Sequence, residues 1–171
     1  MRLEPATPAD LPALHALVER AYRGETARAG WSHEADLLTG PRTSVEELQG
    51  FLNAGENLLV WRDGGVIRAC VRLVRLSDEL MYLGMLTVDP ALQGEGLGKR
   101  LLAAAEAYAR DERGAHRMEM QVFSRRRELL SFYHRRGYQP TGERRPFPYE
   151  QWPDAGAQFE DLEFTVLEKH L

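Results

Sequence analysis

Residues 85–102 read MLTVDPALQGEGLGKRLL, and this stretch decides the fold class. An apolar run ends at a turn formed by Asp89 and Pro90, glycines follow at positions 94, 96 and 98, and a helical pattern then begins. The first turn of a helix leaves backbone N–H groups without partners and carries a partial positive charge, so it suits a phosphate group. Glycines let the backbone approach an anion closely, because they have no Cβ atom. The stretch therefore predicts a strand, a phosphate-binding turn and a helix, with Lys99 adding positive charge.

Two familiar nucleotide-binding loops do not fit this spacing. In a Walker loop, Gln93 would have to be the first glycine and Arg100 the residue with a hydroxyl group. In a dinucleotide-binding fingerprint, the third glycine would fall on Lys99. On the loop alone, an ordinary glycine-rich turn between a strand and a helix remains the alternative to an anion site.

A second segment of the sequence argues against an ordinary glycine-rich turn. Residues 125–136 have apolar side chains at offsets of three and four, and Gly137 is typical of a helix end. The run Phe132–Tyr138 is followed after a short gap by Gly142, and it begins about forty residues after the glycine loop. That interval has room for one helix and one strand.

Both segments resemble one protein family. The loop Gln93–Gly98 resembles the Gln-x-x-Gly-x-Gly acyl-CoA pyrophosphate loop of the GCN5-related N-acetyltransferases, the GNAT family. The run Phe132–Gly142 is similar to that family's Leu-Tyr-x-x-x-Gly-Phe-x-x-x-Gly element. The resemblance extends from about Leu80 to Gly142, and it implies the family's α/β fold, a mixed and mostly antiparallel central sheet with flanking helices, in one domain that spans residues 1–171.

The resemblance also implies a cofactor and a mechanism. The family transfers an acetyl group from acetyl-CoA directly to an amine, without an acyl-enzyme, so Cys70 is not required as a nucleophile. Tyr133 corresponds to the family's general acid beside the thioester sulfur, and the Val88 N–H to the donor that binds the acetyl carbonyl. A bulge in the strand before the loop frees backbone amides for the pantetheine arm. The residues expected to bind the cofactor are Leu86, Thr87, Val88, Gln93, Gly94, Glu95, Gly96, Leu97, Gly98 and Lys99.

The acceptor side is less defined. Trp31, Glu34 and Asp36 are expected to contact the amine from a loop between the first helices, and Tyr82 lies near where some relatives carry a basic Glu. Glu34 and Asp36 are candidate bases, although a solvated acid is the simpler interpretation of each, and a chain of waters could remove the proton instead. Arg126 stands where relatives often place an Asn facing the cofactor. The cluster of arginines at 125–127 predicts a solvated helix start.

The chain shows alternating strand and helix patterns. Caps at Thr7 or Asp10 and at Ser44 predict two helices, and Asp63-Gly64-Gly65 predicts a hairpin. We expect helices to about Tyr22, to about Asn53, from Gly98 to about Arg113 and over Arg125–Arg136, and strands at Leu3–Glu4, Asn57–Trp61, Val66–Leu76, Leu80–Val88, Met118–Phe123, Gln139–Glu143 and Leu162–Leu167.

Composition and charge restrict the classes of molecule that the protein is expected to bind. The net charge of −4 over 171 residues argues against a general nucleic-acid binder, and the sequence has neither a signal-like leader nor a membrane-length apolar run. One cysteine and the spacing of the histidines predict no metal site. We therefore expect a cytoplasmic enzyme that acts on a small-molecule or peptide amine, with no nucleic-acid or membrane partner, and the protein could form a homodimer. The alternative function is a catalytically silent acyl-CoA-binding regulatory module.

Overall fold

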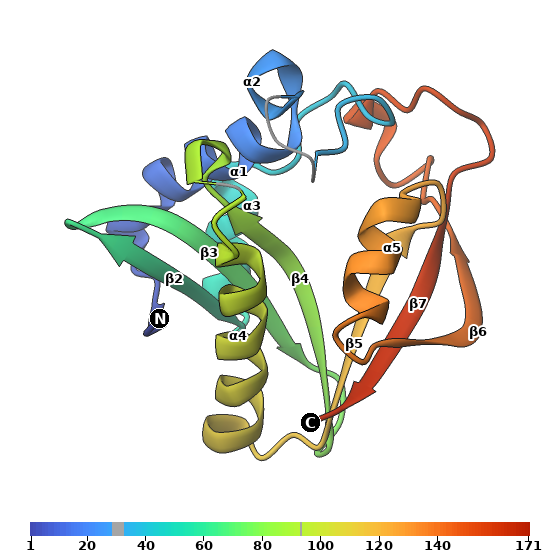
Figure 1. Cartoon of the computed structure of the whole chain (residues 1–171). Coiled ribbons are helices and arrows are strands. Elements are labelled where there is room, and N and C mark those ends of the chain that lie inside the picture. The colour runs from blue at the N-terminus through green and yellow to red at the C-terminus, as the bar shows by residue number, and fades with distance from the viewer. Residues whose placement is uncertain (29–32, 93) are drawn as a thin grey trace.

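The computed structural model describes residues 1–28, 33–92 and 94–171 of the chain (Figure 1). The described residues form one mixed sheet with helices on both of its faces, which confirms the predicted fold class. The helices are α1 (Leu11–Tyr22), α2 (Gly24–Arg28), α3 (Val45–Asn53), α4 (Leu97–Arg113) and α5 (Arg127–His134), and the strands are β1 (Glu4–Pro5), β2 (Asn57–Asp63), β3 (Val66–Arg75), β4 (Leu80–Val88), β5 (Arg117–Phe123), β6 (Gln139–Pro146) and β7 (Glu163–His170).

Most of the predicted elements are confirmed to within a few residues. The Ser44 side chain accepts the Glu47 N–H at 3.0 Å and so caps α3, as its position in the sequence predicts. α4 begins after Gly96 and ends at Arg113, where it is followed by Gly114 in a left-handed conformation with φ of 67°. α5 begins two residues later than the pattern indicates, at Arg127. None of the helices in the described part of the chain is long and apolar enough to cross a membrane.

The seven strands lie in the order β1-β2-β3-β4-β5-β7-β6 within the described residues, and neighbouring strands are antiparallel except for β4 and β5. The parallel pairing of β4 with β5 is short, since it joins only Leu80–Tyr82 to Arg117–Glu119. Beyond Tyr82 the two strands separate, and Figure 1 shows them meeting at one end of the sheet and diverging toward the other. This divergence opens the sheet where β4 leads into the glycine loop.

A bulge in β4 lies in the same region. Cys70 pairs with Thr87 and Arg72 pairs with Gly84, so Met85 and Leu86 together lie opposite the one intervening residue of β3. Met85 has φ of 50°, the only positive φ of a non-glycine residue among those described. The extra residue takes Met85 and Leu86 out of the regular ladder, as the family resemblance implies for this strand.

Two hydrophobic cores, one on each face of the sheet, hold the helices in place. The side chains of β2 alternate between them, because Leu59 packs in the core under α4 and α5 while Leu58 and Val60 pack in the core under α1 and α3. The sheet is therefore covered on both faces, and α5 and α1 approach the open end of the β4–β5 gap from opposite sides (Figure 1).

Candidate active site

Two cavities meet at the open end of the sheet. The first, here called the loop cavity, has a volume of about 260 Å³ and is bounded by the glycine loop and α5. The second, here called the arginine cavity, has a volume of about 510 Å³. It is lined by residues of the segment 34–51, of strands β4 and β5, and of the segment 147–155. The residues that line both cavities are Tyr22, Leu86, Arg126, Leu129 and Tyr133.

The glycine loop forms one wall of the loop cavity. Gly94 and Gly96 have φ of 95° and 73°, and Gly96 is the residue from which α4 starts. A Cβ atom at either glycine would meet nothing within 4 Å, so the space beside the loop is open. Open space beside the N-terminus of a 17-residue helix is suited to an anionic group.

The other residues predicted to bind the cofactor divide into two groups. Those that line the loop cavity are Leu86, Val88, Gly94, Gly96, Leu97, Gly98 and Lys99. Thr87 is buried, with its hydroxyl donating to the Met85 carbonyl at 3.0 Å, and Glu95 is exposed outside the cavity lining. Gln93 lies outside the described residues.

Tyr133 lies at the junction of the two cavities. Its side chain is 5 % exposed, and its ring contacts those of Phe132 and Tyr138 at centroid distances of 5.3 and 5.9 Å. Burial raises the pKa of the Tyr133 hydroxyl, so this group stays protonated over the ordinary pH range. Its hydroxyl has no hydrogen-bond partner in the described part of the chain. The group is therefore a proton donor beside open space.

Tyr22, at the end of α1, holds the β4 bulge from the opposite side. Its hydroxyl donates to the Leu86 carbonyl at 2.8 Å, and burial raises its pKa to about 12. This hydrogen bond joins the first helix to the strand that leads into the glycine loop. Tyr22 is not among the site residues predicted from the sequence, because an aromatic residue at the end of an amphipathic helix is typical of a hydrophobic core.

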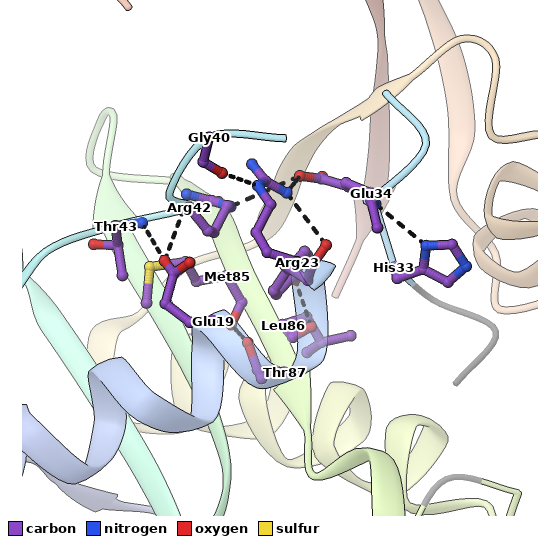
Figure 2. Close-up of polar contacts among 12 residues, drawn as sticks. Glu19, Arg23, His33, Glu34, Gly40, Arg42, Thr43, Met85, Leu86 and Thr87 are labelled. Carbon is purple, nitrogen blue, oxygen red and sulfur yellow. Dashed lines mark hydrogen bonds and ion pairs between the residues drawn. The ribbon is translucent and has the colours of Figure 1, made fainter. Parts of the chain in front are cut away.

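Glu34 is surrounded by arginines in the arginine cavity. Its carboxylate lies 2.8 Å from Arg23, 3.7 Å from Arg126 and 4.0 Å from Arg42. Figure 2 shows the Arg23 and Arg42 side chains turned toward Glu34, and the Arg23 Nε–H donating to the Gly40 carbonyl at 2.8 Å. Burial by itself raises the pKa of the Glu34 carboxyl, but the three positive charges outweigh it and hold the pKa below its usual value of 4.5.

These contacts correct two expectations from the sequence. Glu34 is not a solvated acid, since its side chain is 13 % exposed, and its lowered pKa makes it a weak base. Arg126 is not part of a solvated helix start, because its side chain is 11 % exposed and borders both cavities. The buried carboxylate of Glu34 stabilises this arginine where the start of α5 alone would disfavour it.

The remaining predicted acceptor residues lie in different places. Tyr82 lines the arginine cavity, and burial raises its pKa. Asp36 is 72 % exposed, forms an ion pair with Arg28 at 3.0 Å and lines neither cavity. Trp31 lies outside the described residues.

A short ladder closes the outer wall of the arginine cavity. Residues 37–40 pair with residues 155–158: the Gly40 N–H donates to the Ala155 carbonyl at 2.8 Å and the Thr39 N–H to the Gly156 carbonyl at 3.0 Å. Both segments contribute to the lining or lie beside it. No local sequence pattern predicts this pairing, because its two segments are more than a hundred residues apart in the chain.

The carboxylates of the cavity lining offer no strong base. Within the lining that the structure describes, the acids are Glu34, Glu47 and Asp154. Glu34 is held by arginines, Glu47 accepts a hydrogen bond from the Thr43 hydroxyl, and Asp154 is exposed.

Known proteins share this fold and part of this sequence. The mycothiol acetyltransferase of Salinispora tropica is 43% identical over 54 residues, which are 32% of this chain and 18% of the relative. The corresponding protein of Salinispora arenicola is 43% identical over 62 residues, which are 36% of this chain and 20% of the relative. The matched part thus spans about a fifth of the length of these curated relatives.

Solved structures match over nearly the whole chain. The ribosomal-protein-alanine N-acetyltransferase from Brucella melitensis has a TM-score of 0.70 at 18% identity, with 100% of both chains covered. YncA from Salmonella typhimurium, solved with its cofactor acetyl-CoA, has a TM-score of 0.67 at 22% identity, with 100% of this chain and 94% of that chain covered. At these identities the structures establish the shared fold.

The sequence profile of the Acetyltransferase (GNAT) family matches residues 12–138, a range that runs from α1 through the glycine loop to Tyr138. This range covers most of the chain and contains the residues that line both cavities. The chain therefore belongs to the Acetyltransferase (GNAT) family.

Proposed function

We propose that this protein transfers the acetyl group of acetyl-CoA directly to a primary amine of a small molecule or peptide, with Tyr133 as the general acid. The observation that carries the proposal is the position of Tyr133, whose buried and protonated hydroxyl lies where the two cavities meet. A group in that position can reach a thioester that enters from one side and an amine that enters from the other.

Acetyl-CoA is the donor, and the loop cavity is its proposed site. Gly94 and Gly96–Lys99 would hold the pyrophosphate through backbone N–H groups at the start of α4. The pantetheine arm would then follow the bulged end of β4, past Leu86 and Val88, to the junction. The open space at Gly94 and Gly96 supports this path, since no protein atom lies where their Cβ atoms would be.

The residues at the junction have separate proposed roles in the reaction. The neutral amine attacks the thioester carbonyl, and the oxygen gains negative charge that the Val88 backbone would stabilise. When the carbon–sulfur bond breaks, the thiolate takes the proton of the Tyr133 hydroxyl. Water accepts the proton of the amine, because Glu34 has a lowered pKa.

The alternative is a module that binds acyl-CoA without turnover. The weakness of the acids in the described lining of the arginine cavity favours it, since such a site deprotonates an amine slowly. The protonated tyrosine at the junction favours the enzyme, because binding alone gives that hydroxyl no role.

Tyr133→Phe tests the proposal, because it removes one hydroxyl and keeps the packing of the ring. General acid catalysis typically contributes 10²–10⁴-fold, so kcat for thiol release from acetyl-CoA with an amine panel should fall by about that factor. The calorimetric Kd for acetyl-CoA should change little. Tyr108→Phe is the matched control, since the Tyr108 hydroxyl bonds Asn57 at 3.3 Å outside both cavities.

Two results would contradict the proposal. A Tyr133→Phe variant within a factor of two of the unaltered protein in kcat would remove Tyr133 from the reaction. Acetyl-CoA binding without thiol release from any amine would identify the protein as the silent module.

A further inference from the structure

We infer that the acceptor amine carries an anionic group, a carboxylate in the simplest case, which binds to Arg42 and Arg126 in the arginine cavity. This inference rests on the proposed function, because it names the chemical class of the molecule that receives the acetyl group.

The first observation is a concentration of positive charge around one carboxylate, with side chains that are 8 % (Arg23), 11 % (Arg126) and 29 % (Arg42) exposed. Arg23, Arg42 and Arg126 all face the single carboxylate of Glu34. A fourth arginine of the lining, Arg72, is already neutralised, since its Nη2 donates to Glu56 at 2.9 Å and its Nε to the other oxygen of the same carboxylate. Three arginines thus face the one carboxylate of Glu34, while the other two acids of the described lining, Glu47 and Asp154, form no ion pair with them.

The second observation is the geometry of the three arginines. Arg23 is fully engaged, with bonds of 2.8 Å to Glu34 and 2.8 Å to the Gly40 carbonyl. Arg126 and Arg42 lie 3.7 and 4.0 Å from Glu34, too far for hydrogen bonds, and neither guanidinium donates a hydrogen bond to any described residue. A guanidinium has five N–H donors, and no nitrogen of Arg42 or Arg126 is both enclosed and without a partner among the described residues, so their unused donors are open to a ligand in the cavity. The Arg42 guanidinium also lies over the Tyr22 ring, 5.3 Å from its centroid. The fork of an arginine matches a carboxylate in particular.

The third observation is where these donors lie. Arg126 borders both cavities together with Tyr133, so an anion held there lies close to the reacting amine. Arg42 lines only the arginine cavity, so its donors are directed at the acceptor rather than at the cofactor. Phe123, Phe147 and Trp152 line the outer part of that cavity and suit an apolar remainder. These features together describe a compact amine with an adjacent anion and an apolar side chain, such as an apolar α-amino acid.

The same charges disfavour a polyamine acceptor. An ammonium group that enters the arginine cavity meets the guanidiniums of Arg42 and Arg126, which share the carboxylate of Glu34 with Arg23, and like charges repel. An acceptor with a carboxylate relieves that repulsion.

Matched acceptor pairs test the inference. Leucine and leucinamide, and phenylalanine and phenylalaninamide, differ in the carboxylate but keep the amine and the side chain. Thiol release from acetyl-CoA should be faster with each amino acid than with its amide, and faster than with spermidine. Amides or spermidine that are used as well as the amino acids would overturn the inference.

Arginine variants locate the anion site. Arg126→Gln and Arg42→Gln each leave Glu34 with two arginines, so both should fold. We expect the KM of the amino acid to rise by about 10- to 100-fold, or about 1.4–2.8 kcal/mol at 1.4 kcal/mol per tenfold change. For Arg42→Gln, the KM of the amide and the Kd of acetyl-CoA should change by less than about threefold. Arg126 also lines the loop cavity, so for Arg126→Gln the diagnostic quantity is the ratio of the KM values of the amino acid and its amide. The control is Arg28→Gln, since Arg28 pairs with exposed Asp36 and lines neither cavity. Equal losses for the amino acid and its amide would refute the assignment.

A binding measurement separates this inference from the proposed function. In the presence of CoA, the amino acid should raise the melting temperature of the unaltered protein, the amide should not, and Arg126→Gln should remove the difference. If that pattern holds without thiol release, the protein is a module with an anion site and only the proposed function fails. If amino acid and amide shift the melting temperature equally, the inference fails whatever the turnover.

Discussion

Gly96 is where one added methyl group tests the proposed cofactor loop most sharply. Its φ of 73° places it in the left-handed region, which costs a residue with a Cβ atom about 1–2 kcal/mol. In Gly96→Ala the new Cβ meets no atom within 4 Å, so any effect arises from backbone strain rather than from a clash inside the protein.

The strain has two measurable consequences. For a chain of 171 residues, 1 kcal/mol corresponds to about 2–4 °C, so the melting temperature without ligand should fall by about 2–8 °C. Relief of the strain also rotates the peptide group after Gly96 and turns an N–H away from the loop cavity. Loss of one hydrogen bond to a charged phosphate costs about 1.5–3 kcal/mol, which raises the Kd of acetyl-CoA by roughly 10- to 150-fold.

Thermal unfolding with and without acetyl-CoA measures both effects. At a concentration of about 100 times its Kd, the ligand adds about 2.7 kcal/mol to the stability of the unaltered protein. If the Kd of the variant is tenfold higher, the same concentration adds only about 1.4 kcal/mol. Titration calorimetry then gives each Kd directly.

Gly114→Ala is the matched control for backbone strain. Gly114 follows the other end of α4 with φ of 67°, its Cβ would also meet nothing within 4 Å, and it lines neither cavity. This control should melt about 2–8 °C lower and keep the stabilisation by acetyl-CoA. A Gly96→Ala variant that melts lower as expected and yet binds acetyl-CoA as tightly as the unaltered protein would refute the proposed loop site.

Two further predictions concern the arginine cavity. Gly40→Ala would place a Cβ at 2.7 Å from the backbone carbon of Ala155 and closer still to the Asp154 carbonyl, so the ladder between residues 37–40 and 155–158 must separate. In steady-state kinetics we expect the acceptor KM to rise about 10- to 100-fold, with acetyl-CoA affinity unchanged. The control Gly50→Ala, whose Cβ meets nothing within 4 Å, should leave the acceptor KM unchanged. Glu34→Gln removes the carboxylate shared by the largely buried Arg23 and Arg126 and the partly exposed Arg42, and it should lower stability at pH 7 by about 3 kcal/mol in a denaturant titration. Because the pKa of Glu34 is lowered in the folded protein, its contribution is present above pH 4.5 and is lost as the pH falls through the folded pKa; a stability profile of Glu34→Gln parallel to that of the unaltered protein below pH 4.5 would contradict this.

Local sequence patterns were sufficient for the strands, the glycine loop and all the helices given above except the short α2, which was not predicted. The alternation of apolar residues in β2, the cap at Ser44 and the glycines from 94 to 98 act over a few residues, so their physical causes can be read in the sequence itself. The helical spacing around Tyr133 and the stop at Gly137 likewise placed the candidate acid on the correct helix. The roles of these residues in catalysis stay predictions.

The tertiary structure alone decided the character of the acceptor side. Arg23, Glu34, Arg42 and Arg126 come from four places in the chain, and each of them read singly suggests a solvated surface charge. Their burial depends on the divergence of β4 from β5 and on the ladder between residues 37–40 and 155–158, which bring distant segments around one cavity. A charge can be buried only where opposite charges meet it, and that condition is a property of the folded arrangement rather than of any local pattern.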